Sequence, residues 1–196
     1  MTIHVTPISA ESLGVRSLAV LVETSGLRIL LDAGVSLGSR YGLVPHPKEY
    51  LALKEARAKI RKQAERCDLI TISHYHFDHY TPTWRSIEAK WTWSSYSEAK
   101  EIYGGRLVCA KDIRSLINPS QRRRGYIFGK IAGDFVKELR YVDSTSLTSN
   151  NTKVVFSQPV PHGENGTPLG YLLMVSVEED GYILMYCSDV QGPVSS

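Results

Sequence analysis

Three histidines and an aspartate lie within six consecutive residues of the chain, in the segment SHYHFDHY: His74, His76, Asp78 and His79. The segment follows directly on Asp68–Ser73, a short apolar run between polar flanks that we interpret as a buried strand. In an extended chain residues i and i+2 point to the same side, so His74 and His76 can face one point. A turn would then bring Asp78 and His79 to a neighbouring point. Imidazole and carboxylate groups so placed suit Zn²⁺, or Fe and Mn ions.

The alternative is that these histidines are ordinary surface or core residues. The chain has six His in all. Crowding half of them beside an aspartate would gain nothing for folding without a metal, so we favour a metal site. Such a site would support metal-assisted hydrolysis, because two metals about 3.5–4 Å apart share a water and lower its pKa towards about 7, which gives a metal-bound hydroxide.

The pattern HxHxDH at the end of a strand resembles the signature of the metallo-β-lactamase superfamily. Further segments extend this resemblance over residues 1–190: ILLDAG contains Asp32, PVPHGENGTPLGY contains His162, and YILMYCSD ends at Asp189. In detail, the segments SLGVRS, NPSQRRRG and SDVQGP are similar to an uncharacterised archaeal branch of metallo-hydrolases.

The resemblance implies a role for each matching residue. Asp32 would orient the motif loop from behind the ligands. Antibiotic-degrading members of the superfamily lack a histidine at the position of His79 and carry a cysteine at that of Asp189, so lactam hydrolysis is not expected. The first metal would be held by His74, His76 and His162, the second by Asp78 and His79, with Asp189 shared.

The resemblance predicts a metal-dependent hydrolase with one or two Zn²⁺ ions, or with Mn²⁺ or Fe²⁺. Asp78, His79 and Asp189 would serve catalysis as ligands rather than as free bases. The substrate would be a phosphodiester, in a nucleic acid or nucleotide, or a small ester, thioester or lactone. The alternative is a metal-binding or regulatory protein without turnover.

Positive charge is concentrated in two segments, residues 48–66 and 111–130. In the second, Arg122, Arg123 and Arg124 follow a predicted helix start, where backbone N–H groups favour anions. We expect these arginines to border the metal cleft and bind a phosphate-bearing substrate, with nucleic acid as one option. The alternative is a solvated helix face, and only Tyr126 and Phe128 are near enough for base stacking.

The 196 residues, 42% of them apolar, fit one domain spanning residues 1–196. No apolar run approaches the ~20 residues of a membrane span, and no secretory signal is visible at the N-terminus. Three separated cysteines fit the reducing cytoplasm.

Hydrophobic periodicity and turn residues predict the elements. Helices are expected from Pro47, near Ser97–Tyr103, and from Ser120 as N-cap, the last with a stripe of Ile127, Ile131, Phe135 and Leu139. Strands are expected at Ile3–Pro7, Ser17–Thr24, Arg28–Asp32, Asp68–Ser73, Leu107–Ala110, Lys153–Gln158, Tyr171–Val177 and Tyr182–Cys187.

The expected fold is therefore α+β, the superfamily's four-layer αββα sandwich with two mixed sheets, lacking its C-terminal portion. The chain stops seven residues after Asp189 and has no histidine after His162, whereas the family has a further one. We therefore predict an N-terminal portion of a longer protein or a naturally shortened form. It would hold the first metal more firmly than the second. It would expose an apolar sheet face for a missing segment or a partner subunit, as in a homo-oligomer, to cover.

Overall fold

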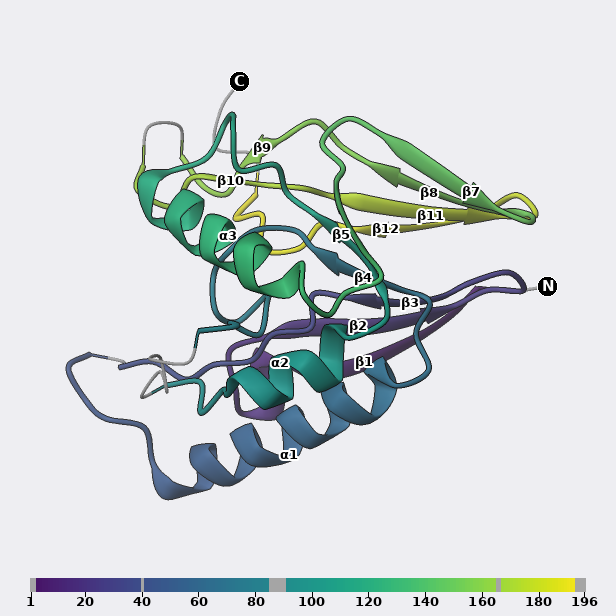
Figure 1. Cartoon of the computed structure of the whole chain (residues 1–196). Helices are drawn as coiled ribbons and strands as arrows, with labels where there is room; N and C mark the ends of the chain where they lie inside the picture. The colour runs from purple at the N-terminus through teal and green to yellow at the C-terminus, as the bar shows by residue number, and fades with distance from the viewer. Residues whose placement is uncertain (1–2, 40, 85–90, 165–166, 193–196) are drawn as a thin grey trace.

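The computed structural model of the chain describes residues 3–39, 41–84, 91–164 and 167–192. Figure 1 shows two sheets, one above the other, with α1 and α2 against the outer side of the larger sheet. The larger sheet has six strands and the smaller has four, and a separate two-stranded ribbon lies near the end where the metal motif is found. This is the α+β two-sheet arrangement predicted from the sequence.

The six-stranded sheet is mixed. Its first three strands pair antiparallel, and the strands from the third onward pair parallel. Parallel neighbours need crossover connections, and each crossover contains one helix among its described residues. In spatial order the strands are β1 (His4–Ala10), β2 (Leu18–Glu23), β3 (Arg28–Leu31), β4 (Leu69–Ile72), β5 (Leu107–Ala110) and β6 (Glu138–Tyr141).

The helices α1 (Pro47–Ala64) and α2 (Tyr96–Tyr103) form where periodicity predicted them. His46 caps α1 by accepting a hydrogen bond from the backbone N–H of Lys48 at 3.2 Å, and Pro47 occupies the first turn, where its missing N–H costs nothing. The predicted apolar stripe of α1, from Leu53 to Ala64, is buried. A one-turn 3₁₀ helix, Glu11–Leu13, was not anticipated.

The third helix, α3 (Pro119–Ala132), differs from the prediction at both ends. Its N-cap is Asn118, whose side chain accepts from the N–H of Gln121 at 2.7 Å, rather than Ser120. It ends at Ala132, so the predicted stripe does not continue to Phe135. The buried positions are instead Gln121, Gly125, Phe128 and Ala132.

The four-stranded sheet is antiparallel throughout, which corrects the expectation of two mixed sheets. The predicted strand Tyr171–Val177 is divided into two strands in different sheets. In spatial order the strands are β12 (Tyr182–Tyr186), β11 (Val175–Glu179), β8 (Thr152–Phe156) and β7 (Ser146–Ser149), and the ribbon pairs β9 (Val160–Pro161) with β10 (Tyr171–Leu172).

Two apolar cores hold these layers together. Because successive strand residues point to opposite faces, Leu30 packs towards the helices while Ile29 and Leu31 pack towards the second sheet. Helices cover one face of the six-stranded sheet, so within the described ranges three layers of the expected αββα sandwich are present. The outer face of the four-stranded sheet carries no helix among these residues.

The large exposed apolar side chains of that outer face lie along its edge strand, β12. Ile183 and Met185 are 68% and 55% exposed there. In the next rows of the same face, Lys153 and Glu178 form an ion pair at 3.6 Å. The large exposed apolar side chains of the predicted face are therefore confined to one strand, and the half-buried Val155 is an apolar residue of the same face on β8. All three cysteines are free thiols, and no helix in the described part of the chain has the length and hydropathy needed to cross a bilayer.

Candidate metal centre

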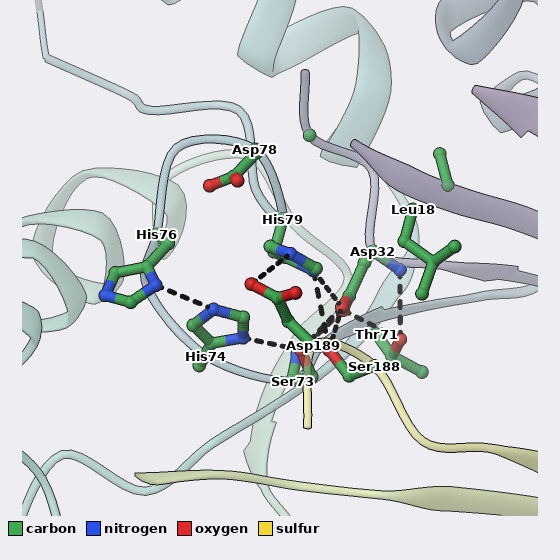
Figure 2. A network of polar contacts seen from close by, with 12 residues as sticks. Leu18, Asp32, Thr71, Ser73, His74, His76, Asp78, His79, Ser188 and Asp189 are labelled. Atoms are coloured by element: carbon green, nitrogen blue, oxygen red, sulfur yellow. Dashed lines mark hydrogen bonds and ion pairs between the residues drawn. The ribbon is translucent and has the colours of Figure 1, made fainter. Parts of the chain in front are cut away.

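The histidine motif lies in the loop that follows β4, at the edge where strand ends of both sheets meet (Figure 2). His162 comes directly after β9, and Asp189 lies three residues beyond β12. The backbone N–H of His162 donates to the carbonyl of Gly170, and its own carbonyl accepts from the N–H of Gln191. These bonds tie the loop of His162 to the loop of Asp189.

Four side chains converge on one point: the three histidines that the resemblance assigned to the first metal, and Asp189, which it assigned to both metals. His74, His76, His162 and Asp189 each present one ligand atom, and these atoms all lie within 4.8 Å of one another. His74 Nε2 lies 3.0 Å from His76 Nδ1, and His162 Nε2 lies 2.9 Å from Asp189 Oδ2. Bonds of about 2.0–2.1 Å to one ion place ligand atoms roughly 3–4 Å apart, so the spacing fits a metal.

A second group shares one member with the first. Asp78, His79 and Asp189 also present atoms within 4.8 Å of one another, and His79 Nε2 lies 3.7 Å from Asp189 Oδ2. Figure 2 shows Asp78 and His79 side by side above Asp189. The arrangement can hold two ions with Asp189 between them.

Asp32 is the buried centre that orients this cluster. Its side chain is inaccessible to solvent, and it accepts hydrogen bonds from the backbone N–H of Ser73 at 2.8 Å and from His79 Nδ1 at 2.8 Å. The hydroxyls of Tyr186 and Ser188 donate to the same carboxylate at 2.9 and 3.1 Å. Because Nδ1 of His79 is bound to Asp32, its Nε2 faces Asp189.

The rings of His74 and His76 are also contacted by the protein. Ser73 Oγ lies 2.9 Å from His74 Nδ1, which leaves His74 Nε2 directed at the cluster. Gln121 Nε2 lies 3.3 Å from His76 Nε2, and His76 Nδ1 faces His74. The Ser73 hydroxyl can accept the N–H of His74 Nδ1, which is the second contact that a metal-ligating histidine makes, whereas the amide nitrogen of Gln121 can only donate to His76.

Asp32→Asn is expected to weaken zinc binding by about ten- to hundredfold. The asparagine side chain has no negative charge to orient His79, and one of the two accepting oxygens of Asp32 is replaced by an NH₂ group. Competition against a chromophoric chelator measures the affinity. Asp134→Asn, at an exposed position beyond α3, is the matched control and should leave affinity unchanged. Equal affinity for Asp32→Asn and the wild type would contradict the positioning role.

The histidines divide by their protonation. Burial, together with the neighbouring histidines, lowers the pKa of His74 well below its usual value, and burial lowers the pKa of His76 to about 4. Both are therefore neutral at pH 7 with lone pairs available to a metal. Burial also lowers the pKa of His79, but its hydrogen bonds with Asp189 and Asp32 outweigh that effect and raise it to about 10. A metal at His79 would take the place of a proton.

The two groups lie in a cleft of about 540 Å³. Arg16, which sequence reasoning did not single out, is the only lysine or arginine among the described residues that line it, and its Nη2 lies 3.5 Å from Asp78 Oδ2. The remaining lining residues are Ala10, Glu11, Ser12, Ser17, Leu18, His76, Asp78, His79, His162, Leu169, Asp189 and Gln191.

The three arginines of α3 do not gather at this cleft. Arg124 supports the motif loop, since its Nη1 donates to the carbonyl of Tyr75 at 3.1 Å and its guanidinium lies 4.2 Å from the ring centre of Phe77. Arg122 and Arg123 line a separate groove. The helical repeat of 3.6 residues turns consecutive side chains by about 100°, so three neighbouring arginines cannot share one face.

Tyr186, Ser188 and Gln121 complete the site without having been foreseen. Gln121 lies in the first turn of α3 and contacts the motif loop, and its amide oxygen accepts from the N–H of Tyr75 at 3.3 Å. Nothing in the local sequence marks Tyr186, because its contact with Asp32 spans 154 positions of the chain. Tyr75 and Tyr80, which flank the ligands in sequence, are fully buried and pack in the core.

No protein-family model matches the chain. It is similar to curated archaeal proteins named UPF0282 protein. The one from Thermococcus kodakarensis is 42% identical over 189 residues, which is 96% of this chain and 62% of that protein. The one from Pyrococcus horikoshii is 43% identical over 188 residues, 95% of this chain and 60% of its own length. The chain thus spans about three-fifths of these relatives.

Solved structures align more loosely. The metallo-beta-lactamase fold protein YhfI from Bacillus subtilis has a TM-score of 0.49 and 14% identity, over 94% of this chain and 62% of its own. A possible metal-dependent hydrolase from Veillonella parvula has a TM-score of 0.49 and 13% identity, over 96% of this chain and 62% of its own. The assignment of the fold therefore rests on this chain's own motif, strand order and convergent ligand atoms.

Proposed function

We propose that this chain, which has the metallo-β-lactamase fold and resembles the archaeal UPF0282 proteins, is a metal-dependent hydrolase. One observation carries the proposal: ligand atoms from three segments far apart in sequence, the motif 74–79, His162 and Asp189, converge at an open cleft. A structural metal site is closed by its protein ligands, whereas a catalytic site keeps a position open to substrate.

Zinc is the metal that the donor set fits best. The three imidazoles of His74, His76 and His162 match the three-histidine pattern of catalytic zinc sites. Asp78, His79 and Asp189 would form the second position, which suits zinc but also Mn²⁺ or Fe²⁺. The first ion would be held more firmly, because its group has more nitrogen ligands.

The metals would supply a water of lowered pKa and polarise the bond to be cleaved. The chain's own residues supply the rest. Asp32 and Ser73 fix the ring orientations of His79 and His74 by the hydrogen bonds described above. Arg16, whose side chain is 47% exposed, extends into the cleft and provides a positive charge for an anionic substrate. A phosphodiester therefore fits better than a small ester, thioester or lactone.

Purified protein loaded with Zn²⁺ or Mn²⁺ tests this proposal on a chromogenic phosphodiester and a chromogenic carboxylic ester. We expect phosphodiester turnover. Arg16→Ala should raise KM for the phosphodiester by about tenfold and leave that for the neutral ester unchanged, since the charge is partly solvated. Lys54→Ala, on the exposed side of α1, is the control. A metal-loaded protein that hydrolyses neither substrate would favour the binding or regulatory alternative.

A further inference from the structure

A second open cavity, of about 530 Å³, lies on the outer side of α3. It is lined by Ile113, Arg114, Pro119, Arg122, Arg123 and Tyr126. None of these residues lines the metal cleft. The helix therefore presents functional groups on two faces. Gln121 and Arg124 contact the motif loop, and Arg122, Arg123 and Tyr126 form one wall of the second cavity, which we call the arginine groove.

The arginine groove carries uncompensated positive charge. Residues 119–132 contain four arginines and lysines and no aspartate or glutamate. Arg114 is bound to Asp112, at 2.6 Å. In the described part of the chain, Arg122 and Arg123 are found in no ion pair, and both are exposed. Two guanidinium groups beside one cavity favour an anionic ligand with more than one charged group.

An aromatic ring lies within the same groove. Tyr126 is 59% exposed, whereas Phe128, the other aromatic residue of the helix, is fully buried. An exposed aromatic ring between arginines is costly to leave in water and is the arrangement on which nucleic-acid bases stack. Of the two aromatic residues that the sequence offered for stacking, the structure makes Tyr126 the one available.

The groove is built on a rigid support. A Cβ atom on Gly125 would lie 2.5 Å from a side-chain carbon of Ile113 and 2.6 Å from the ring of Tyr75, so the helix packs closely on both. The opposite wall follows β5, where the fully buried Lys111 binds Asp143 at 2.6 Å and also donates to the carbonyl of Ser115. The arginines and Tyr126 are therefore presented from fixed backbones.

We propose that the arginine groove binds single-stranded nucleic acid, with Arg122 and Arg123 on backbone phosphates and Tyr126 stacked on a base. A duplex offers its phosphates but keeps its bases stacked, so it would leave Tyr126 unused. An acidic polypeptide would use the arginines alone. The single strand is the ligand that uses both features of the groove.

This inference does not rest on the proposed hydrolysis, because the groove and the metal cleft share no lining residue. The two sites are nevertheless joined by α3. Gln121 contacts His76 from one side of the helix, and Arg122, the next residue, is turned from it by about 100° and lines the groove. A bound strand could extend from the groove to the cleft.

Fluorescence anisotropy with a labelled single-stranded oligonucleotide of about 15 nucleotides tests the proposal. The double variant Arg122→Ala/Arg123→Ala should weaken binding by at least about tenfold and lower the slope of log K against log salt by about 1–2. Tyr126→Ala should weaken binding by about tenfold, and Tyr126→Phe should bind as the wild type, since the ring is kept.

The matched control is Lys54→Ala/Lys59→Ala, which removes the same charge from exposed positions of α1 in the other basic segment. It should bind as the wild type. Circular dichroism would verify that every variant is folded. Three results would each overturn the proposal: wild-type binding by the double arginine variant, an equal loss in the lysine control, or no effect of Tyr126→Ala. Equal competition by a duplex or by polyglutamate would also overturn it and would identify a different class of ligand.

Discussion

His162→Ala is expected to lower the zinc content of the purified protein by about one ion per chain and to abolish its hydrolytic activity. The ring is 2% exposed, and its Nε2 lies 2.9 Å from Asp189 Oδ2, so alanine removes one ligand of the first metal and the partner of the ligand shared by both. Only His74 and His76 would remain as histidine ligands beside the shared Asp189, so the first metal would be held more weakly than at a typical three-histidine zinc site. Elemental analysis after dialysis measures the content.

His4→Ala is the control for this variant, because His4 is an exposed histidine of β1 outside the metal cleft. It should retain the wild-type zinc content and activity. His162→Ala should also keep its circular dichroism spectrum, since His162 lies in a loop beside the short β9–β10 ribbon rather than in either large sheet. Wild-type zinc content in folded His162→Ala would show that the first metal lies elsewhere.

The part of the site that the sequence could predict is the part built by local geometry. His74 and His76 are two residues apart at the end of a buried strand, and such a spacing directs two side chains to one side. Their convergence is observed at 3.0 Å. His162 and Asp189 are far away in the sequence, and only the resemblance to a known superfamily placed them here.

The arginines show where a sequence pattern fails. A run of three basic residues at a helix start suggests one basic patch. The direction of each side chain, however, depends on how α3 is rotated about its axis relative to the residues on which it packs. That rotation is set by Gly125, which allows α3 to lie against the ring of Tyr75. It turns Arg124 towards the motif loop and leaves Arg122 and Arg123 in another groove.

The sequence predicted the boundaries of strands that stay within one sheet. It did not predict the boundary where the chain passes from one sheet to another. β5 has the predicted limits, Leu107–Ala110, because it lies inside a sheet, between β4 and β6, and three of its four residues are buried. The apolar run from Tyr171 to Val177 looks like one strand, yet its first two residues pair with β9 and its last three belong to β11. Hydrophobicity alone does not reveal the change of partner.

Gly34→Ala is expected to destabilise the fold by about 3 kcal/mol and to weaken metal binding with it. A Cβ atom on Gly34 would lie 2.1 Å from the backbone nitrogen of Tyr80 and 2.4 Å from the carbonyl carbon of His79. Both are backbone atoms of the motif loop, which cannot turn aside as a side chain can. The loop would have to move away from Asp32, whose carboxylate holds His79 at 2.8 Å.

Urea unfolding and chelator competition measure the two effects on the same protein. Gly38→Ala, four residues along the same segment, is the matched control, because its Cβ would meet only the mobile end of Arg16, at 3.2 Å. That change should alter the free energy of unfolding by less than about 1 kcal/mol. If Gly34→Ala unfolds at the same urea concentration as Gly38→Ala, the close approach of Gly34 to the motif loop does not contribute to the stability of the fold. If Gly34→Ala unfolds at a lower urea concentration and binds zinc more weakly, the packing of Gly34 against the motif loop stabilises both the fold and the metal centre, because this loop packs against Gly34 and also carries the metal ligands.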